Sequence, residues 1–142
     1  MSILIIDGPN LNLLGKREPE IYGHLTTDDM LQTVNNALGG RTDVEYFQSN
    51  HEGAIVDKLH AVGFDTDKYA GIVLNAGAYT HTSLAIADAI AAIRVPVVEV
   101  HISNIQARAE AIRHTSLLTP VCRGIIAGFG INSYALAALS LV

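Results

Sequence analysis

The sequence predicts an α/β protein built on a five-stranded parallel sheet with helices on both faces. Segments typical of strands and of helices alternate five times along the 142 residues. The strand segments are mostly continuous apolar runs, which is typical of parallel strands that are buried on both sides. The usual doubly wound order of five strands is 2-1-3-4-5, which places a ligand beyond the carboxyl ends of strands one and three. No linker or repeat interrupts the pattern, so residues 1–142 are expected to form a single domain.

The first half of the chain alternates two strands with two helices. Residues 2–6 form the first expected strand, and after a long loop Thr26 or Thr27 caps the first helix. β-branched and aromatic residues at 44–48 predict the second strand, and Asn50 is expected to cap the second helix. The apolar faces of these two helices are expected to be Leu31, Val34 and Leu38, and Ile55, Leu59 and Val62.

The second half repeats the alternation. Apolar runs at 71–74 and 95–100 predict strands three and four, and residues 125–127 predict the fifth strand. The helices between and after these strands are expected at residues 83–93, at 104 to about 114, and from about 132 onward.

Composition limits the class of protein and its surroundings. Hydrophobic residues make up 49% of the chain and charged residues 16%, so we expect part of the apolar surface to contact other copies of the chain. The net charge of −5 argues against a nucleic-acid partner. A single cysteine, Cys122, and the lack of a signal-peptide pattern are typical of the reducing cytoplasm. Residues 124–142 approach the length of a membrane span, but their central glycines predict a turn instead, so no membrane partner is expected.

The stretch 7–23, DGPNLNLLGKREPEIYG, is a long polar loop for so small a domain. Loops of this length usually act as lids or binding loops, with glycines as hinges. It contains Tyr22, which is a poor base at the ordinary tyrosine pKa of about 10 unless guanidinium groups stabilise the phenolate. Arg17 lies in the same loop, and Arg113 could approach from a later helix. From spacing alone, a packed loop tyrosine beside a surface arginine is the favoured interpretation.

The fourth strand carries the strongest anomaly. Glu99 lies near the end of a buried strand, where an unpaired carboxylate is costly. His101 is two residues further on, so both side chains point to the same side. A carboxylate fixes the tautomer of a neighbouring imidazole and favours its protonated form, which suits a general acid. The alternative is a structural Glu–His pair with no catalytic role.

Other polar groups follow the third and fourth strands. Asn75 and His81 lie between a strand end and a helix start, where anions and polar groups bind well. The backbone of Ile102 and Ser103 and the serine hydroxyl suit a carboxylate, although ordinary helix capping explains these residues too. Asp88 lies in mid-helix without a basic partner at helical spacing, so it either faces solvent or meets another subunit.

Signals for other chemistries are weak. The glycine turn at 128–130 lacks the third glycine of a dinucleotide fingerprint, and there is no phosphate-binding Walker loop. His81, Glu99 and His101 could be assembled into a metal site, but no tight ligand motif supports one, so no metal is expected.

Four segments together resemble the type II 3-dehydroquinate dehydratases: the 7–23 loop, QSNHEG, NAGAYTHTS and VEVHISN. They occur in the family's order and cover nearly the whole chain. The resemblance implies a flavodoxin-like three-layer sandwich forming one catalytic domain. It further implies a hydro-lyase of the shikimate pathway, which leads to chorismate and the aromatic amino acids. This enzyme would convert 3-dehydroquinate to 3-dehydroshikimate through an enolate, without cofactor or metal.

The resemblance also implies a role for each candidate residue. Tyr22 would remove the proton next to the ketone, and Arg17 on the mobile lid would keep it ionised. Asn10 would hold a water that stabilises the enolate. His101, oriented by Glu99, would protonate the departing hydroxyl. The implied substrate-binding residues are Asn75, His81, Asp88, Ile102, Ser103 and Arg113.

The family assembles as a dodecamer, a tetramer of trimers, in which Asp88 would reach the site of a neighbouring subunit. The sequence also departs from the family pattern at a few places. Asp7 stands where the motif usually has asparagine, and Ala78 where glycine is frequent. One extra residue lies between Arg108 and Arg113.

A second interpretation of the same architecture is a non-enzymatic module that binds a flavin or acts as a receiver domain. A receiver requires clustered acids after the first strand and a lysine after the last, but Asp7 is alone and no lysine follows Lys68. A flavin protein would be yellow when purified.

Overall fold

The computed structural model describes residues 1–22 and 24–142, apart from the side chain of Tyr22. Five parallel strands form one sheet in the order β2-β1-β3-β4-β5, as the sequence predicted. The strands are β1 (Ser2–Asp7), β2 (Asp43–Gln48), β3 (Tyr69–Asn75), β4 (Val97–His101) and β5 (Gly124–Ala127). Register pairs Asp7 with Gln48 on one side and with Asn75 on the other, so polar side chains meet at the carboxyl ends.

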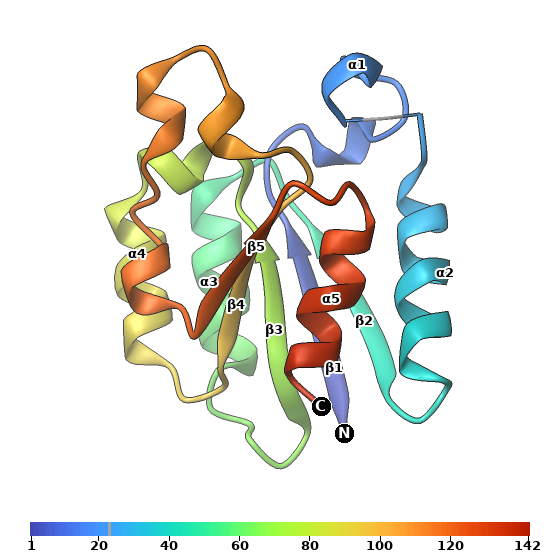
Figure 1. Cartoon of the computed structure of the whole chain (residues 1–142). Coiled ribbons are helices and arrows are strands. Elements are labelled where there is room, and N and C mark those ends of the chain that lie inside the picture. The colour runs from blue at the N-terminus through green and yellow to red at the C-terminus, as the bar shows by residue number, and fades with distance from the viewer. Residues whose placement is uncertain (23) are drawn as a thin grey trace.

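Helices cover both faces of the sheet and give three layers (Figure 1). The helices are α1 (Pro19–Tyr22), α2 (Thr27–Leu38), α3 (Glu52–Val62), α4 (Leu84–Ala92) and α5 (Asn132–Ser140). Short 3-10 segments are η1 (Leu11–Leu13), η2 (Gly77–His81), η3 (Ile105–Ala107), η4 (Ala111–His114) and η5 (Thr119–Val121). In Figure 1, α1 and the segment with η3 and η4 both lie above the carboxyl ends of the strands.

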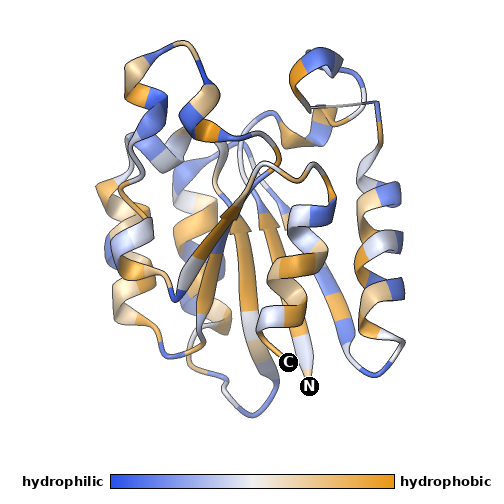
Figure 2. Ribbon diagram, in the orientation of Figure 1, coloured by the Kyte–Doolittle hydropathy of each residue, from blue (hydrophilic) through white to orange (hydrophobic). Residues whose placement is uncertain are grey.

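Two apolar cores hold these layers together. Ile3 and Ile5 of β1 pack with α2 and α5, whereas Leu4 and Ile6 pack with α3 and α4. This alternation follows from the strand, whose successive side chains point to opposite faces. Figure 2 shows apolar colouring along the central strands and more polar colouring on β2 at the edge. The sheet therefore gives a rigid base to the loops at its carboxyl end.

Local signals explain where the helices begin and end. Thr26 caps α2 in a capping box, accepting a hydrogen bond from the Asp29 N–H while Asp29 accepts one from the Thr26 N–H. Gly39 ends α2 with a φ of 65°, a left-handed conformation that glycine adopts at little cost. Ser83 caps α4 by accepting the Ile86 N–H.

Two local predictions were wrong and one was incomplete. Asn50 does not cap α3; its side chain accepts the Asn10 N–H and a Gln48 N–H instead. The predicted inward face of α2 packs against the core, but it also includes Met30, which is fully buried, whereas Leu31 is partly buried. The expected helix from 104 to about 114 is two short 3-10 turns, because side chains bond to the backbone within this segment, as in the bond from Gln106 to the His114 carbonyl.

The uncharged residues 124–142 form β5, a glycine turn and α5. Across the described part of the chain, every helix is too short or too polar to cross a lipid bilayer.

Candidate active site

A cavity of about 140 Å³ opens at the carboxyl ends of β1, β3 and β4. Eight residues that the sequence analysis selected line it: Asn10, Arg17, Asn75, His81, His101, Ile102, Ser103 and Arg113. They come from three separate loops, which meet because parallel strands end at the same edge of the sheet. A wider hollow of about 510 Å³ adjoins this cavity between α1 and the turn before α5.

Two glycines allow the first and third loops to approach each other. A Cβ atom on Gly8 would lie 2.4 Å from the carbonyl oxygen of Ala76, which is closer than any side chain tolerates. Gly77 has a φ of 62° and stands against Pro9. Asn10, also left-handed with a φ of 69°, is fixed by its N–H bond to Asn50. The two loops therefore pack directly against each other at the edge of the cavity.

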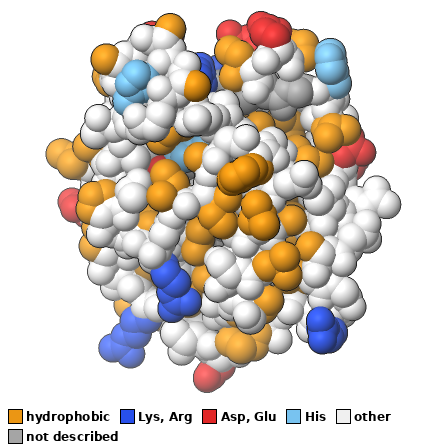
Figure 3. Space-filling model, in the orientation of Figure 1, with side chains coloured by type: hydrophobic (Ala, Val, Ile, Leu, Met, Phe, Trp, Pro, Cys, Tyr) orange, Lys and Arg blue, Asp and Glu red, His pale blue; other side chains and the backbone are white. Residues whose placement is uncertain are grey.

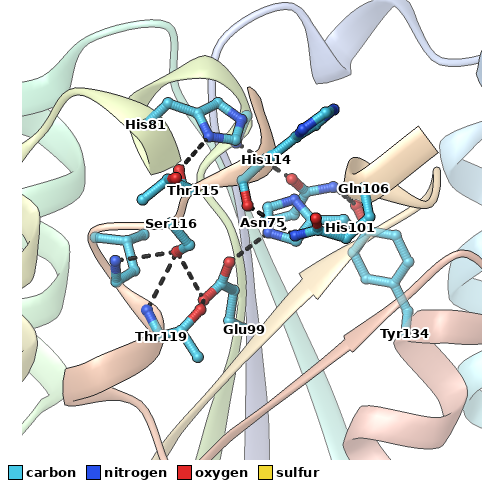
Figure 4. Close-up of polar contacts among 12 residues, drawn as sticks. Asn75, His81, Glu99, His101, Gln106, His114, Thr115, Ser116, Thr119 and Tyr134 are labelled. Atoms are coloured by element: carbon cyan, nitrogen blue, oxygen red, sulfur yellow. Dashed lines mark hydrogen bonds and ion pairs between the residues drawn. The ribbon is translucent and has the colours of Figure 1, made fainter. Parts of the chain in front are cut away.

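Glu99 and His101 form a buried pair, as the alternation of β4 predicted. The His101 Nε2 lies 2.5 Å from a Glu99 carboxylate oxygen, and Glu99 has no exposed surface. The other carboxylate oxygen accepts hydrogen bonds from the hydroxyls of Thr119 and Ser116 at 2.6 and 3.0 Å. Figure 4 shows this cluster below and to the left of the His101 ring. With Nε2 bonded to Glu99, the Nδ1 atom of His101 is the ring nitrogen left for a ligand.

Glu99 remains ionised despite its burial. Burial alone would raise its pKa, but the hydrogen bonds from His101, Thr119 and Ser116 outweigh burial and hold the pKa below its ordinary value. A charged carboxylate can only accept hydrogen bonds, so the Nε2 of His101 must carry its proton.

His81 lies beside His101 with the two rings 6.5 Å apart and nearly parallel. Its Nδ1 is 2.7 Å from the Thr115 carbonyl, to which it donates. In the neutral ring this leaves Nε2 as an acceptor. The two histidines are thus fixed in different ways, one by a carboxylate and one by a backbone carbonyl.

Guanidinium groups give the cavity its charge. Arg17 pairs with Glu18 at 3.6 Å, and Arg113 pairs with Glu110 at 3.4 Å. Arg108 also lines the cavity, although the sequence analysis did not select it. Arg108 could have been predicted from its position, because it lies in the same segment after β4 as Arg113. The three guanidinium groups make this cavity suitable for an anion, in a protein whose net charge is −5.

Two of the predicted residues, Glu99 and Asp88, do not line the cavity, and the side chain of a third, Tyr22, is not among the described parts of the chain. Glu99 stands behind His101. Asp88 is exposed on α4, and in the single chain it matches the solvent-facing interpretation. Tyr22 ends α1, but its side chain and residue 23 lie outside the described residues. The expected caps after β4 were also different, since Asn104 and not Ser103 caps η3. Among the described residues, no three His, Cys, Asp or Glu side chains are grouped to hold a metal ion.

The fold and cavity define a doubly wound α/β protein with an arginine-lined cavity at its topological switch point. Over residues 1–142 the chain matches the family model described as dehydroquinase class II, and it belongs to that family.

Curated relatives and solved structures agree with this family. The chain is 51% identical to a 3-dehydroquinate dehydratase of an Exiguobacterium species, over all of this chain and 94% of the relative. It is 52% identical to a protein of the same name from Caldicellulosiruptor bescii, over 99% of this chain and 95% of the relative. The crystal structure of a type II dehydroquinase from Butyrivibrio crossotus superposes with a TM-score of 0.92 at 46% identity, covering 99% and 97% of the two chains.

Proposed function

We propose that this chain is a 3-dehydroquinate dehydratase, a hydro-lyase that removes water from 3-dehydroquinate to give 3-dehydroshikimate in the shikimate pathway. Family membership supports this activity, since relatives about half identical over nearly their whole length have that name. The observation that carries the proposal is the convergence of eight selected side chains from three loops on one cavity.

On the acid side of the reaction, His101 gives a proton to the departing hydroxyl. This role is supported by the Glu99 bond to Nε2, which leaves Nδ1 for the substrate. The buried carboxylate stabilises the imidazolium before proton transfer. After transfer, the hydroxyl leaves as water and the ring is neutral.

On the base side, Tyr22 takes the proton from the carbon next to the ketone, and the electron pair forms an enolate. Arg17 lines the cavity and stabilises the Tyr22 phenolate. Asn10 holds a water that donates to the enolate oxygen. The enolate then expels the hydroxyl one carbon further on, which His101 protonates. The atoms balance as one molecule of substrate giving one of product and one of water.

The substrate carboxylate is bound by Ser103 and the backbone at Ile102, with Arg113 beside it. Asn75 and His81 bind the hydroxyls of the ring. Support for this arrangement is their shared cavity and the fixed tautomer of His81.

A turnover assay tests the proposal. Purified protein should convert 3-dehydroquinate to a conjugated enone, followed by its ultraviolet absorption, and chelator should have no effect. Tyr22→Phe should lower kcat by 100-fold or more, about the contribution of a positioned base. Tyr79→Phe is the matched control, because its hydroxyl donates to the Asn50 carbonyl and does not line the cavity. Full activity in Tyr22→Phe would rule out the base.

We also propose that the chain assembles in the cytoplasm into a dodecamer, a tetramer of trimers, with Asp88 reaching a neighbouring site. Exposed apolar side chains support self-association; they include Ile125, Phe129, Leu136 and Leu139. Figure 3 shows hydrophobic side chains gathered on the face formed by β5 and α5. Light scattering gives the mass of the assembly directly, and a monomer with full turnover would exclude the shared site. If Asp88 reaches a neighbouring site in the assembly, Asp88→Asn should raise KM without changing the mass.

A further inference from the structure

Asp7 is a buried carboxylate that the proposed mechanism does not use. It ends β1 next to the cavity and has no exposed surface. The Tyr134 hydroxyl donates to one of its oxygens at 2.7 Å, and the Tyr46 hydroxyl donates to the other at 2.8 Å. Burial raises the pKa of Asp7 to about 6, against the opposing effect of these hydrogen bonds, so the group is ionised at neutral pH. An ionised carboxylate only accepts, so both tyrosine protons must point toward it.

The direction of the Tyr134 hydroxyl proton limits the hydrogen bonds that its oxygen can make with other neighbours. The side chain is fully buried, and burial together with the Asp7 charge raises its pKa far above the usual value, so the phenol keeps its proton. Since that proton is directed to Asp7, the Tyr134 oxygen can only accept from its other neighbour. The neighbour is the Asn75 side-chain nitrogen at 2.9 Å.

Asn75 is thereby oriented from both ends. Its Nδ2 donates to Tyr134, and its Oδ1 accepts the Gly77 N–H at 3.2 Å. Reversing the amide would place an acceptor against the Tyr134 oxygen and a donor against the Gly77 N–H, losing both bonds. Asn75 is nearly buried and lines the cavity. The second Nδ2 proton is the donor that remains for a ligand.

We infer that Asp7 and Tyr134 are positioning residues of the proposed active site, which fix the Asn75 amide so that it offers an N–H donor to the substrate. This inference rests on the proposed function only for the identity of the substrate. The chain Asp7–Tyr134–Asn75 joins β1, α5 and β3, so substrate affinity depends on a helix whose residues do not line the cavity.

A double-mutant cycle tests this inference. Tyr134→Phe keeps the ring and removes the acceptor, so KM should rise about tenfold while kcat stays within threefold, the scale of one hydrogen bond. Asn75→Ala should raise KM by more. In the Asn75→Ala background, Tyr134→Phe should have no further effect on KM, because Tyr134 acts through Asn75. KM effects that multiply in the double variant would overturn the inference.

Three further variants distinguish a positioning role from a general loss of structure. Asp7→Ala should raise KM, and Asp7→Asn should restore it, because the asparagine oxygen takes the Tyr134 proton while its amino group faces Tyr46. Tyr46→Phe is the matched control; it contacts the same carboxylate but not Asn75, and its KM should equal that of the wild type. If Tyr46→Phe raised KM as much as Tyr134→Phe does, the effect would not depend on the hydrogen-bond chain from Asp7 through Tyr134 to Asn75, and the inference would be contradicted.

A measurement on the unmodified protein covers the case in which a variant does not fold. In ¹⁵N-labelled protein, quinate, which has a hydroxyl in place of the ketone, should shift one Asn75 side-chain proton and leave its Tyr134-bound partner unchanged. Equal shifts of both protons would overturn the inference. Wild-type turnover separates the two hypotheses: its absence refutes the proposed function, whereas normal turnover with unchanged KM in Tyr134→Phe refutes only the positioning path.

Discussion

Asp7 and Glu99 are two carboxylates in the same kind of place, yet they behave in opposite ways. Both lie on interior strands of the parallel sheet, Asp7 as the last residue of β1 and Glu99 as the middle residue of β4, and both have no exposed surface. Burial raises the pKa of Asp7 to about 6, whereas the pKa of Glu99 is held below its ordinary value. Burial is the largest single influence on each group, so the difference comes from their partners.

The partners differ in number and in charge. Asp7 accepts from two tyrosine hydroxyls. Glu99 accepts from two hydroxyls and also from an imidazole that can become a cation. A third, ionisable donor is sufficient to change the sign of the pKa shift. Glu99 is therefore suited to support proton transfer, and Asp7 to fix the direction of hydrogen bonds.

Glu99→Gln should have the largest effect. A glutamine cannot accept hydrogen bonds from His101 and from both hydroxyls at once. The Ser116 oxygen already accepts two backbone N–H groups, so the Ser116 hydroxyl proton is directed to residue 99 and has no alternative acceptor. The His101 ring loses its fixed tautomer, and kcat should fall about 1,000-fold, within the range for general acid catalysis. Steady-state kinetics at pH 7.5 give this value. A loss below tenfold would mean that Glu99 is only structural.

Asp7→Asn should increase the free energy of unfolding at high pH. The ordinary pKa of 3.8 rises to about 6, so the stability from this group is complete below pH 4 and is lost as pH rises through 6. At about 1.4 kcal/mol per pH unit, ionisation destabilises the fold by about 3 kcal/mol at pH 8. The variant should therefore gain up to about 3 kcal/mol at pH 8 and nothing at pH 4. Urea unfolding at the two pH values measures the difference, and a loss of stability at pH 8 would contradict it.

Thr119→Val removes one donor from Glu99 and should raise its pKa. Because the folded pKa is depressed, the stability from Glu99 is present at higher pH and is lost as pH falls through that pKa. The variant should lose about 2 kcal/mol at pH 7, typical of a hydrogen bond to a charged group, and its acid unfolding should begin at higher pH. The exposed Thr115 in the same segment provides the control variant Thr115→Val, which should unfold like the wild type.

Tyr46→Phe should have the smallest effect. It removes one of two donors to Asp7, so the pKa of Asp7 should rise further. At pH 8 the fold should lose about 1 kcal/mol, and at pH 4, where Asp7 is neutral, less. Thermal unfolding at both pH values tests this, and an equal loss at both would show that the bond does not depend on the charge.

The fold was largely predictable because its signals are local. Apolar runs, the Thr26 cap and the glycine after α2 specify elements through their own chemistry, and the strand order follows from general rules for doubly wound sheets. The segment after β4 was less predictable. Its expected helix is replaced by 3-10 turns, held by bonds between side chains and backbone that hydrophobic spacing does not reveal.

The site was predictable to the extent that it lies on β4 or matches a motif. The pairing of Glu99 with His101 follows from two-residue spacing on one strand. Arg108 was not selected because a surface arginine and a cavity arginine look alike in sequence. The Thr119 and Ser116 hydroxyls that keep Glu99 ionised come from a segment about 20 residues away.

The sequence by itself determined the alternation of strands and helices, the polar loops at their ends, and the resemblance that named the reaction. Only the tertiary structure decided which buried carboxylate carries a stable charge and which residues that charge orients. The reason is that pKa values and hydrogen-bond directions depend on all neighbours within a few ångströms. Asp7 is bonded to Tyr134, 127 residues away, and folding alone brings them together.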